Sequence, residues 1–280
     1  MKHYIDTVKQ HFVASIATAE ATAEHREKIL HDFYRYQENA IIEGKNDKNE
    51  RVFILPDVRD KAGTHRLATL MAQHGVEVKQ ATKDFKACGV AYSAGAYFID
   101  TAQPRGRFVK TTFTQQVDMS STFIKEQERR RARKLNDEIY DVTGWSLPLM
   151  FNIDTNACGK EVEVASEKVM ADAPLQGNVT NPKASVAYLV PWGDMAAGRF
   201  LSAALQADLK IKSADKAFVL DKKNQYPAGT LIIEVKANND KLADTVARIA
   251  KQTGASVEGI DSSWVTDGPS FGSGDTVAMH

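Results

Sequence analysis

The sequence has few cysteines, no excess of charge of either sign and no long hydrophobic run. Cys88 and Cys158 are the only cysteines in 280 residues, and they fit no metal-ligand spacing, so two free thiols are expected rather than a disulfide framework. Thirty-six basic residues balance thirty-six acidic ones, which excludes a global field that would attract nucleic acid or an anionic membrane. No segment approaches the roughly 18 apolar residues of a membrane span, and residues 1–6 do not open a secretory signal.

The composition is that of an ordinary globular protein. Hydrophobic residues make up 43% of the chain and charged residues 26%, and 280 residues suffice for one large or two modest domains. The chain starts inside an amphipathic pattern and stops at Thr276–His280, which is typical of the opening of a strand. We therefore expect a piece of a longer protein.

Two stretches of the chain share one sequence pattern. Tyr226–Val235 and Tyr92–Asp100 both begin with Tyr-x-Ala-Gly and continue as an apolar strand. Gly95 and Gly229 supply the turn, because glycine adopts positive φ without a steric penalty. Around each copy the same elements recur at a nearly constant offset, which predicts an internal duplication rather than a solenoid of short repeats.

The predicted fold class is α/β, with two related halves and an N-terminal helical segment. Each half is expected to contain a βαβ unit with parallel strands, followed by a hairpin. In the first half the strand Val52–Leu55 precedes a helix over Asp60–His74, and in the second Ala187–Val190 precedes a helix over Met195–Leu205. The expected boundaries are 1–48 for a helical connector or trailing edge of a preceding region, 49–172 for the first half, 173–184 for a linker and 185–280 for the second half.

Three further elements are predicted. Phe123–Leu135 is a strongly charged helix in which Glu126 and Arg130 can pair at i, i+4, and its arginines are better explained as a solvated face than as a phosphate or nucleic-acid site. Val162–Val164 is a candidate short strand. A last helix is expected over Lys241–Lys251, capped by Asp240, before a closing strand.

Three motifs suggest catalysis but lack necessary partners. His74 and Glu77 match the zinc-ligand pattern H-x-x-E, yet no histidine follows before His280 to complete a site. Gly144–Pro148 resembles a nucleophile elbow around Ser146 but has proline where the glycine belongs. Gly268–Gly274 is glycine-rich without the lysine of a phosphate loop. No catalytic residue, metal ligand or cofactor is therefore predicted in this chain.

The best candidate for a binding site is positional. In open α/β sheets, ligands occupy the crevice beyond the carboxyl ends of parallel strands. Two interpretations remain open, a site for a small molecule or cell-wall peptide, and a purely structural role as helix-capping acids and an interface tryptophan. The candidate residues follow the two strands of the predicted βαβ units: Asp57, Arg59, Asp60, Trp192 and Asp194.

A combination of motifs spread along the chain resembles one family, the large bacterial zinc carboxypeptidases of the M14 family, in the part that follows their peptidase domain. The motifs are YFIDTAQPRGR at 97–107, QVDM at 116–119, EQERR at 126–130, EIYDVTGWSLP at 138–148 and WVTDGPSFGSG at 264–274.

The resemblance implies most of what can be expected about function. It implies an accessory, non-catalytic module whose partner is the adjacent peptidase domain, with zinc held by that domain and not by this chain. It also implies a periplasmic or secreted location. No nucleic acid or membrane span is expected. An independent hydrolase is the remaining alternative, and the chain lacks a complete site for it.

Overall fold

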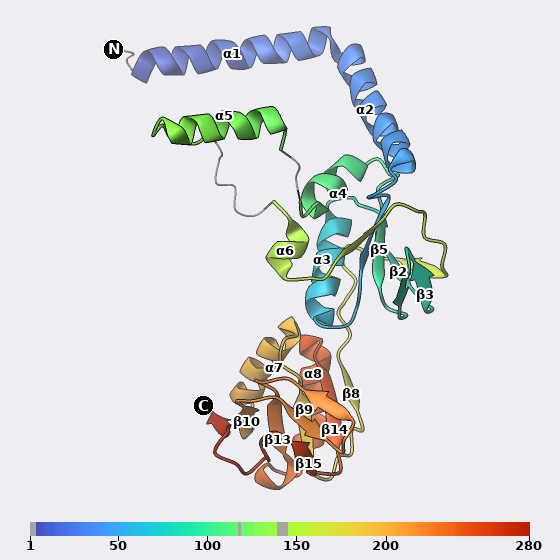
Figure 1. Cartoon of the computed structure of the whole chain (residues 1–280), viewed down its shortest axis with the longest axis vertical. Coiled ribbons are helices and arrows are strands. Elements are labelled where there is room, and N and C mark those ends of the chain that lie inside the picture. The colour runs from blue at the N-terminus through green and yellow to red at the C-terminus, as the bar shows by residue number, and fades with distance from the viewer. Residues whose placement is uncertain (1–3, 117–118, 139–144) are drawn as a thin grey trace.

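The computed structural model describes residues 4–116, 119–138 and 145–280. It shows two mixed α/β units, from which a pair of long helices projects at the N-terminal end (Figure 1). The prediction of a fold that mixes helices and strands is therefore confirmed, although the sheets are largely antiparallel. Within the described ranges, no helix combines the length and the apolar character that crossing a bilayer requires.

The first unit is built on a five-stranded sheet in the order β6-β1-β5-β2-β7, with every neighbouring pair antiparallel. Helices cover one face and a small hairpin, β3-β4, covers the other. The strands are β1 Val52–Leu55, β2 Lys79–Ala81, β3 Phe85–Ala87, β4 Val90–Tyr92, β5 Tyr97–Asp100, β6 Asn156–Cys158 and β7 Ser166–Lys168. The helices are α3 Lys61–Gln73, α4 Gly106–Phe113 and α6 Leu147–Phe151.

The second unit is built on a six-stranded sheet in the order β16-β10-β13-β9-β14-β8. Two helices pack on one face and a three-stranded sheet, β12-β11-β15, lies against the other. The strands are β8 Asn178–Thr180, β9 Ala187–Val190, β10 Ile211–Ala214, β11 Phe218–Leu220, β12 Asn224–Tyr226, β13 Leu231–Glu234, β14 Ser256–Ile260, β15 Val265–Asp267 and β16 Thr276–Met279. The helices are α7 Met195–Gln206, the 3-10 turn η1 Val235–Ala237 and α8 Leu242–Thr253.

The two units share a central arrangement. In the first unit β5 lies between β1 and β2, and in the second β13 lies between β9 and β10, with antiparallel pairing throughout. Each unit also carries a hairpin with a stacked Phe–Tyr pair. The ring centroids are 5.1 Å apart for Phe85 and Tyr92 and 5.0 Å apart for Phe218 and Tyr226, at the same interplanar angle of 20°.

The predicted βαβ units and hairpins are wrong in their pairing. The first and second strands of each unit point the same way, but an antiparallel strand separates them, so the crossover is split. The Tyr-x-Ala-Gly turn does not close a hairpin, because β4 pairs with β3 while β5 enters the main sheet. The physical reason is burial: Tyr97, Phe98 and Ile99 are buried, as suits a central strand with neighbours on both sides.

The arm, defined here as residues 4–46, consists of α1 Tyr4–Glu24 and α2 Arg26–Asn46. It joins the first unit at the end of α2, where Ala40 and Gly44 are buried. A side chain at Gly44 would lie 2.4 Å from the backbone of Thr101, so the close approach requires glycine. In α1, all of which lies in the described range, no residue is buried, and the helix extends away from both units (Figure 1).

The charged helix is α5 Ser121–Ala132, with Ser120 as its cap. The predicted ion pair between Glu126 and Arg130 is wrong. Glu126 instead pairs with Arg129, three residues along the helix, at 2.6 Å, and Arg130 lies 2.9 Å from Glu138. Both i, i+3 and i, i+4 neighbours share a helix face, so spacing alone does not choose between them.

Three smaller predictions need correction. Asp240 does not cap α8, because the residue before the helix is Lys241 and its N-cap position makes no side-chain hydrogen bond. The short strand β7 begins at Ser166, beyond the predicted Val162–Val164, although both of those valines pack against the core. Residues 178–180 of the predicted linker form β8, which pairs in parallel with β14.

The prediction of free thiols is also wrong. Cys88 and Cys158 form a disulfide with their Cα atoms 5.7 Å apart. The bond joins the turn between β3 and β4 to the edge strand β6. Sequence spacing could not reveal it, because the two residues are 70 positions apart and meet only once the hairpin folds over the sheet.

Candidate functional site

The N-termini of α3 and α7 meet where the two units join. Asp60 is the cap of α3, and its Oδ1 atom accepts the backbone N–H of Gly63 at 2.7 Å. The same oxygen accepts the backbone N–H of Met195, the first residue of α7, at 2.9 Å. One carboxylate therefore satisfies a free N–H group at the start of both helices.

Asp194 does the same in the opposite direction. It caps α7 by accepting the N–H of Ala196 at 2.7 Å, and its second oxygen accepts the N–H of Ala62 in α3 at 3.4 Å. Burial raises the pKa of Asp194, the bond from Ala196 opposes this, and the nearby charge of Asp60 raises it further. Ala62 is itself buried within the core of the second unit. The two caps and this alanine hold the units against one another.

Asp57 and Trp192 occupy matching places at the junction. Each follows the proline that ends the first strand of its unit, and each lies over the glycine of a Tyr-x-Ala-Gly turn. A side chain at Gly95 would meet the Asp57 carboxylate at 3.1 Å, and one at Gly229 would meet the Trp192 ring at 2.7 Å. Both glycines have positive φ, +100° and +86°, as the turn prediction requires. The repeated turn thus makes room for the residue that faces the other unit.

The charge of Asp57 is poorly compensated. No hydrogen bond to its carboxylate is seen in the part of the chain that the structure describes. Burial raises the pKa of this carboxyl, the nearby Lys61 and His65 lower it, and the charge of Asp194 raises it. His65 is held in place by Tyr97 at 3.0 Å and by the backbone carbonyl of Ala173 at 2.9 Å.

Arg59 is directed toward the first unit. Its guanidinium donates to the backbone carbonyl of Asn152 at 2.6 Å and lies 3.7 Å from the carboxylate of Asp154. Its side chain remains about half exposed, so the group keeps part of its charge accessible to solvent.

A cavity of about 200 Å³ opens at the junction. We call it the junction cavity. Its lining comes from the ends of β1 and β9, the starts of α3 and α7, and the residues that lead into β14: Val58, Arg59, Lys61, Val190, Pro191, Trp192, Asp194, Ala197, Ala255 and Ser256. Of the five candidate residues, Arg59, Trp192 and Asp194 line this cavity, whereas Asp57 and Asp60 lie beside it.

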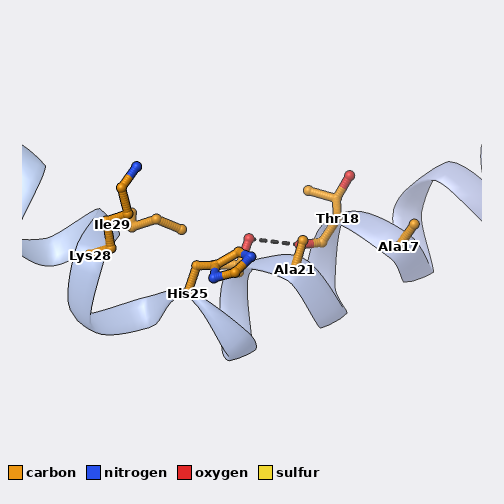
Figure 2. Close-up of a pocket in the computed structure, with 7 residues that line it drawn as sticks. Ala17, Thr18, Ala21, His25, Lys28 and Ile29 are labelled. Carbon is orange, nitrogen blue, oxygen red and sulfur yellow. Dashed lines mark hydrogen bonds between the residues drawn. The ribbon is translucent and has the colours of Figure 1, made fainter.

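A larger hollow lies in the bend of the arm, between α1 and α2. Its volume is about 580 Å³, and it is lined by small or half-polar residues such as Ala17, Ala21, His25 and Lys28. Figure 2 shows these side chains along the two helices. The hydroxyl of Thr22, which also lines the hollow, donates to the backbone carbonyl of Thr18 at 2.7 Å. The hollow belongs to the exposed surface of the arm and contains no converging set of catalytic groups among the residues drawn.

The three motifs that suggest catalysis but lack partners occupy structural positions. His74 ends α3 and lies 5.7 Å from the ring of Phe108, while the N–H of Glu77 donates to Gln103 at 2.7 Å. Ser146 is buried at the start of α6. Gly144, the first residue of the elbow-like motif, lies outside the described residues. Positions 117–118 and 139–143 of the motifs that resemble the M14 family also lie outside them. Gly268–Gly274 is a loop. Among the described residues, no group of three or more His, Cys, Asp or Glu side chains is placed to hold a metal ion.

Lys61 and Ser256 also line the junction cavity, although neither was among the residues predicted from the sequence. Lys61 could have been found, because it directly follows the cap Asp60 and must therefore lie at the start of α3. Ser256 could not, since it enters the cavity only through the position of β14 in the sheet. Comparisons with models of protein families, with curated proteins and with solved structures find no match to this chain.

Proposed function

We propose that this chain is a non-catalytic accessory module of an M14-type zinc metallocarboxypeptidase and that it docks on the peptidase domain through its arm. The observation that carries the proposal is the exposed apolar surface of α1. Phe12 is 68% exposed, Val13 63% and Ile5 55%. Apolar side chains gathered on a surface mark a contact with another protein.

The helix itself argues for a partner. Helices in proteins gain most of their stability from the packing of an apolar face against other parts of the structure. Since α1 buries none of its described residues against the rest of the chain, its stabilising contacts have to come from elsewhere. A neighbouring domain that covers α1 provides them.

The remainder of the chain is a scaffold in this proposal, formed by duplication of one α/β unit. The supporting correspondences are the two strand orders, the two stacked Phe–Tyr pairs and the reciprocal caps Asp60 and Asp194. These residues shape the backbone and the core, and none of them forms a catalytic set.

The disulfide supports the location that the family resemblance implies. Disulfides persist in oxidising compartments such as the periplasm and the extracellular space. The bond between Cys88 and Cys158 is therefore consistent with a periplasmic or secreted parent protein.

Two measurements test the proposal. The purified chain with added zinc should release no C-terminal amino acid from peptides, and metal-dependent turnover that is lost on chelation would contradict it. The chain should also bind the isolated peptidase domain of its parent protein, and Phe12→Asp should weaken that binding at least tenfold. Met170→Asp is the matched control, because Met170 is 59% exposed but lies outside the arm. Equal loss with both variants would argue against docking through α1.

A second candidate function is a binding module for a small molecule or a cell-wall peptide. The observation that favours it is the junction cavity, whose lining comes from both units. A ligand that binds only the folded state raises the melting temperature. Screening with peptides and muropeptides at millimolar concentration should give such a shift, and no shift with any of them would count against this function.

A further inference from the structure

The two edges of the main sheet in the first unit differ in character. β7 forms one edge and carries the exposed charges of Glu167 and Lys168, which discourage another strand from pairing there. β6 forms the other edge with the uncharged residues Asn156, Ala157 and Cys158. Among the described residues, no backbone hydrogen bond is made on the side of β6 that faces away from β1. This edge is therefore open to a further strand.

Two cavities lie next to one another along this edge, and we call them together the edge groove. Their volumes are about 340 and 330 Å³. Gln115 and Thr155 line both cavities and so separate one from the other. The polar cavity is the one that also contacts Asp154, beside α6. The aromatic cavity is the one that contacts Phe53 and Phe113. The groove thus offers two neighbouring sites of different chemistry.

The aromatic cavity has a fixed apolar floor. Phe53 and Phe113 are both buried, and their ring centroids lie 5.4 Å apart. Ala157 lies opposite Phe53 in the register of β6 and β1, so its side chain is on the same face of the sheet and adds only a methyl group to the wall. The cavity therefore has room for a large apolar side chain.

Side-chain amides along the groove are free to bond to a ligand. The amides of Gln115 and Gln116 make no hydrogen bond with any residue that the structure describes. The oxygen of the Asn152 side chain accepts from Arg59 at 3.2 Å, which leaves its NH₂ group as a donor. An amide both donates and accepts, as a peptide main chain does. These groups can therefore bond to the main chain of an added segment.

The acids of the groove give it no excess of charge. Asp154 lies 3.7 Å from Arg59, and Glu50 lies 3.8 Å from Lys110. Each carboxylate in the lining is thus paired with a basic residue just outside it. The groove is close to neutral, and it suits an uncharged segment better than a strongly charged one.

We propose that the edge groove binds an extended segment of a partner protein, which joins the sheet as a strand antiparallel to β6. Main-chain hydrogen bonds to an open edge supply affinity in this mode, and pockets for alternate side chains supply specificity. Side chains at i and i+2 of a strand point to the same face, so an apolar one enters the aromatic cavity and a polar one enters the polar cavity. The antiparallel direction follows the rest of this sheet.

The site is independent of both functions proposed above. The edge groove shares no lining residue with the junction cavity, and it lies outside the arm. Its contacts are made to the middle of the segment and need neither of its ends. The edge is also fixed before binding, because β1 holds β6 on one side and the disulfide holds Cys158. A fixed edge loses little freedom when a strand is added.

NMR titration of the full chain with the capped peptide acetyl-Thr-Phe-Thr-Gln-Thr-amide tests the proposal. An antiparallel strand passes the aromatic cavity first, so Phe precedes Gln, and threonine favours the extended chain. The amide signals of Thr155 and Ala157 should shift on binding. The peptide acetyl-Thr-Phe-Gln-Thr-Thr-amide has the same composition but directs Phe and Gln to opposite faces, and it should bind about tenfold more weakly.

Two variants of the chain test the location. Gln115→Ala removes the amide that lies between the cavities, and Ala157→Phe fills the aromatic cavity. Each should weaken binding of the first peptide about tenfold, and urea unfolding shows whether each variant has kept its fold. Gln225→Ala is the matched control, since Gln225 is an exposed glutamine on β12 in the second unit. It should leave binding unchanged.

N-methylation of the first peptide tests whether it binds as a strand. The N–H groups of successive residues in a strand point to opposite sides, so a methyl group on the Phe nitrogen and one on the nitrogen of the next Thr should have unequal effects. Equal effects, or equal binding of the two unmethylated peptides, would overturn strand addition. Binding that neither Gln115→Ala nor Ala157→Phe weakens would overturn the site, and no binding to the folded chain would overturn the whole inference. None of these results bears on the arm or on the junction cavity.

Discussion

At the scale of single residues, Gly229 and Gly198 make opposite predictions for the same substitution. Gly229 has φ +86°, and an added Cβ would lie 2.7 Å from the Trp192 ring. Gly229→Ala should therefore lower the free energy of unfolding by about 1–3 kcal/mol, since it adds both backbone strain and a clash. Gly198 lies exposed in α7 with open space around it, so Gly198→Ala should raise stability by about 0.5–1 kcal/mol.

Urea unfolding of the two variants and the unchanged chain measures this contrast. The shift in midpoint at constant slope reports the change in stability. A neutral Gly229→Ala would contradict the role assigned to the turn, and destabilisation by Gly198→Ala would contradict the open space around that glycine.

Asp57 predicts a pH dependence. Burial is the main cause that raises the pKa of its carboxyl, so the folded chain binds this proton more tightly than the unfolded chain. The stability that protonated Asp57 contributes is present below the unfolded pKa and is lost as pH rises through the folded pKa. Asp57→Asn removes this loss.

The free energy of unfolding of Asp57→Asn, relative to the unchanged chain, should therefore increase from acidic pH to pH 7. Parallel denaturant titrations at several pH values between these limits give the difference directly. A difference that is constant, or that falls with rising pH, would show that the carboxyl is not held in an unfavourable environment.

The sequence predicted residue properties better than residue partners. Positive φ at Gly95 and Gly229 follows from the Tyr-x-Ala-Gly pattern, and Asp60 could be predicted as a helix cap because it directly precedes the apolar periodicity of α3. That Asp60 also receives the N–H of Met195 could not be predicted. This bond depends on how two units pack, and no local pattern encodes it.

At the scale of elements, the disulfide connects a hairpin to the sheet beneath it. Cys88 and Gly89 both have positive φ, 46° and 84°, as a tight two-residue hairpin turn requires. The turn brings Cys88 to Cys158 on β6. Replacing both cysteines by alanine should lower the free energy of unfolding by roughly 2–4 kcal/mol, because the unfolded chain regains the freedom of a long loop.

Reductant provides the control for this prediction. Dithiothreitol should bring the stability of the unchanged chain close to that of the double variant and should leave the double variant unaffected. If reductant had no effect on the unchanged chain, the bond would not contribute to its stability.

Helices were easier to predict than sheet order for a physical reason. The apolar periodicity of α3, α7 and α8 is local, and Leu242, Val246, Ile249 and Ala250 are buried as expected. Strand order depends on contacts between distant segments, so the insertion of β5 between β1 and β2 left no local trace. The same reason explains why only part of the candidate site could be predicted. Trp192 and Arg59 follow strands that could be recognised, but the residues from β14 reach the cavity only through the sheet.

At the scale of the whole molecule, the reciprocal caps predict cooperation between the two units. Asp60 and Asp194 each bond the helix of the other unit, at 2.9 Å and 3.4 Å. Serine at either position still caps its own helix but is too short to reach the other one. Each of Asp60→Ser and Asp194→Ser should therefore cost about 0.5–1.5 kcal/mol, the net value of one hydrogen bond.

The double variant distinguishes a shared junction from two separate caps. Both bonds hold the same pair of helices, so losing one weakens the other. The destabilisation of the double variant should therefore differ from the sum of the two single variants by about 0.5 kcal/mol or more. Calorimetry should show one transition for the unchanged chain and a broader or split transition for the double variant, as the units begin to unfold separately.

Asp240→Ser is the control, because Asp240 is an exposed acid next to α8 and is not the residue that precedes that helix. It should change the free energy of unfolding by less than about 0.5 kcal/mol. Additive costs together with an unchanged single transition would mean that Ala62 and its apolar neighbours, and not the aspartates, couple the two units.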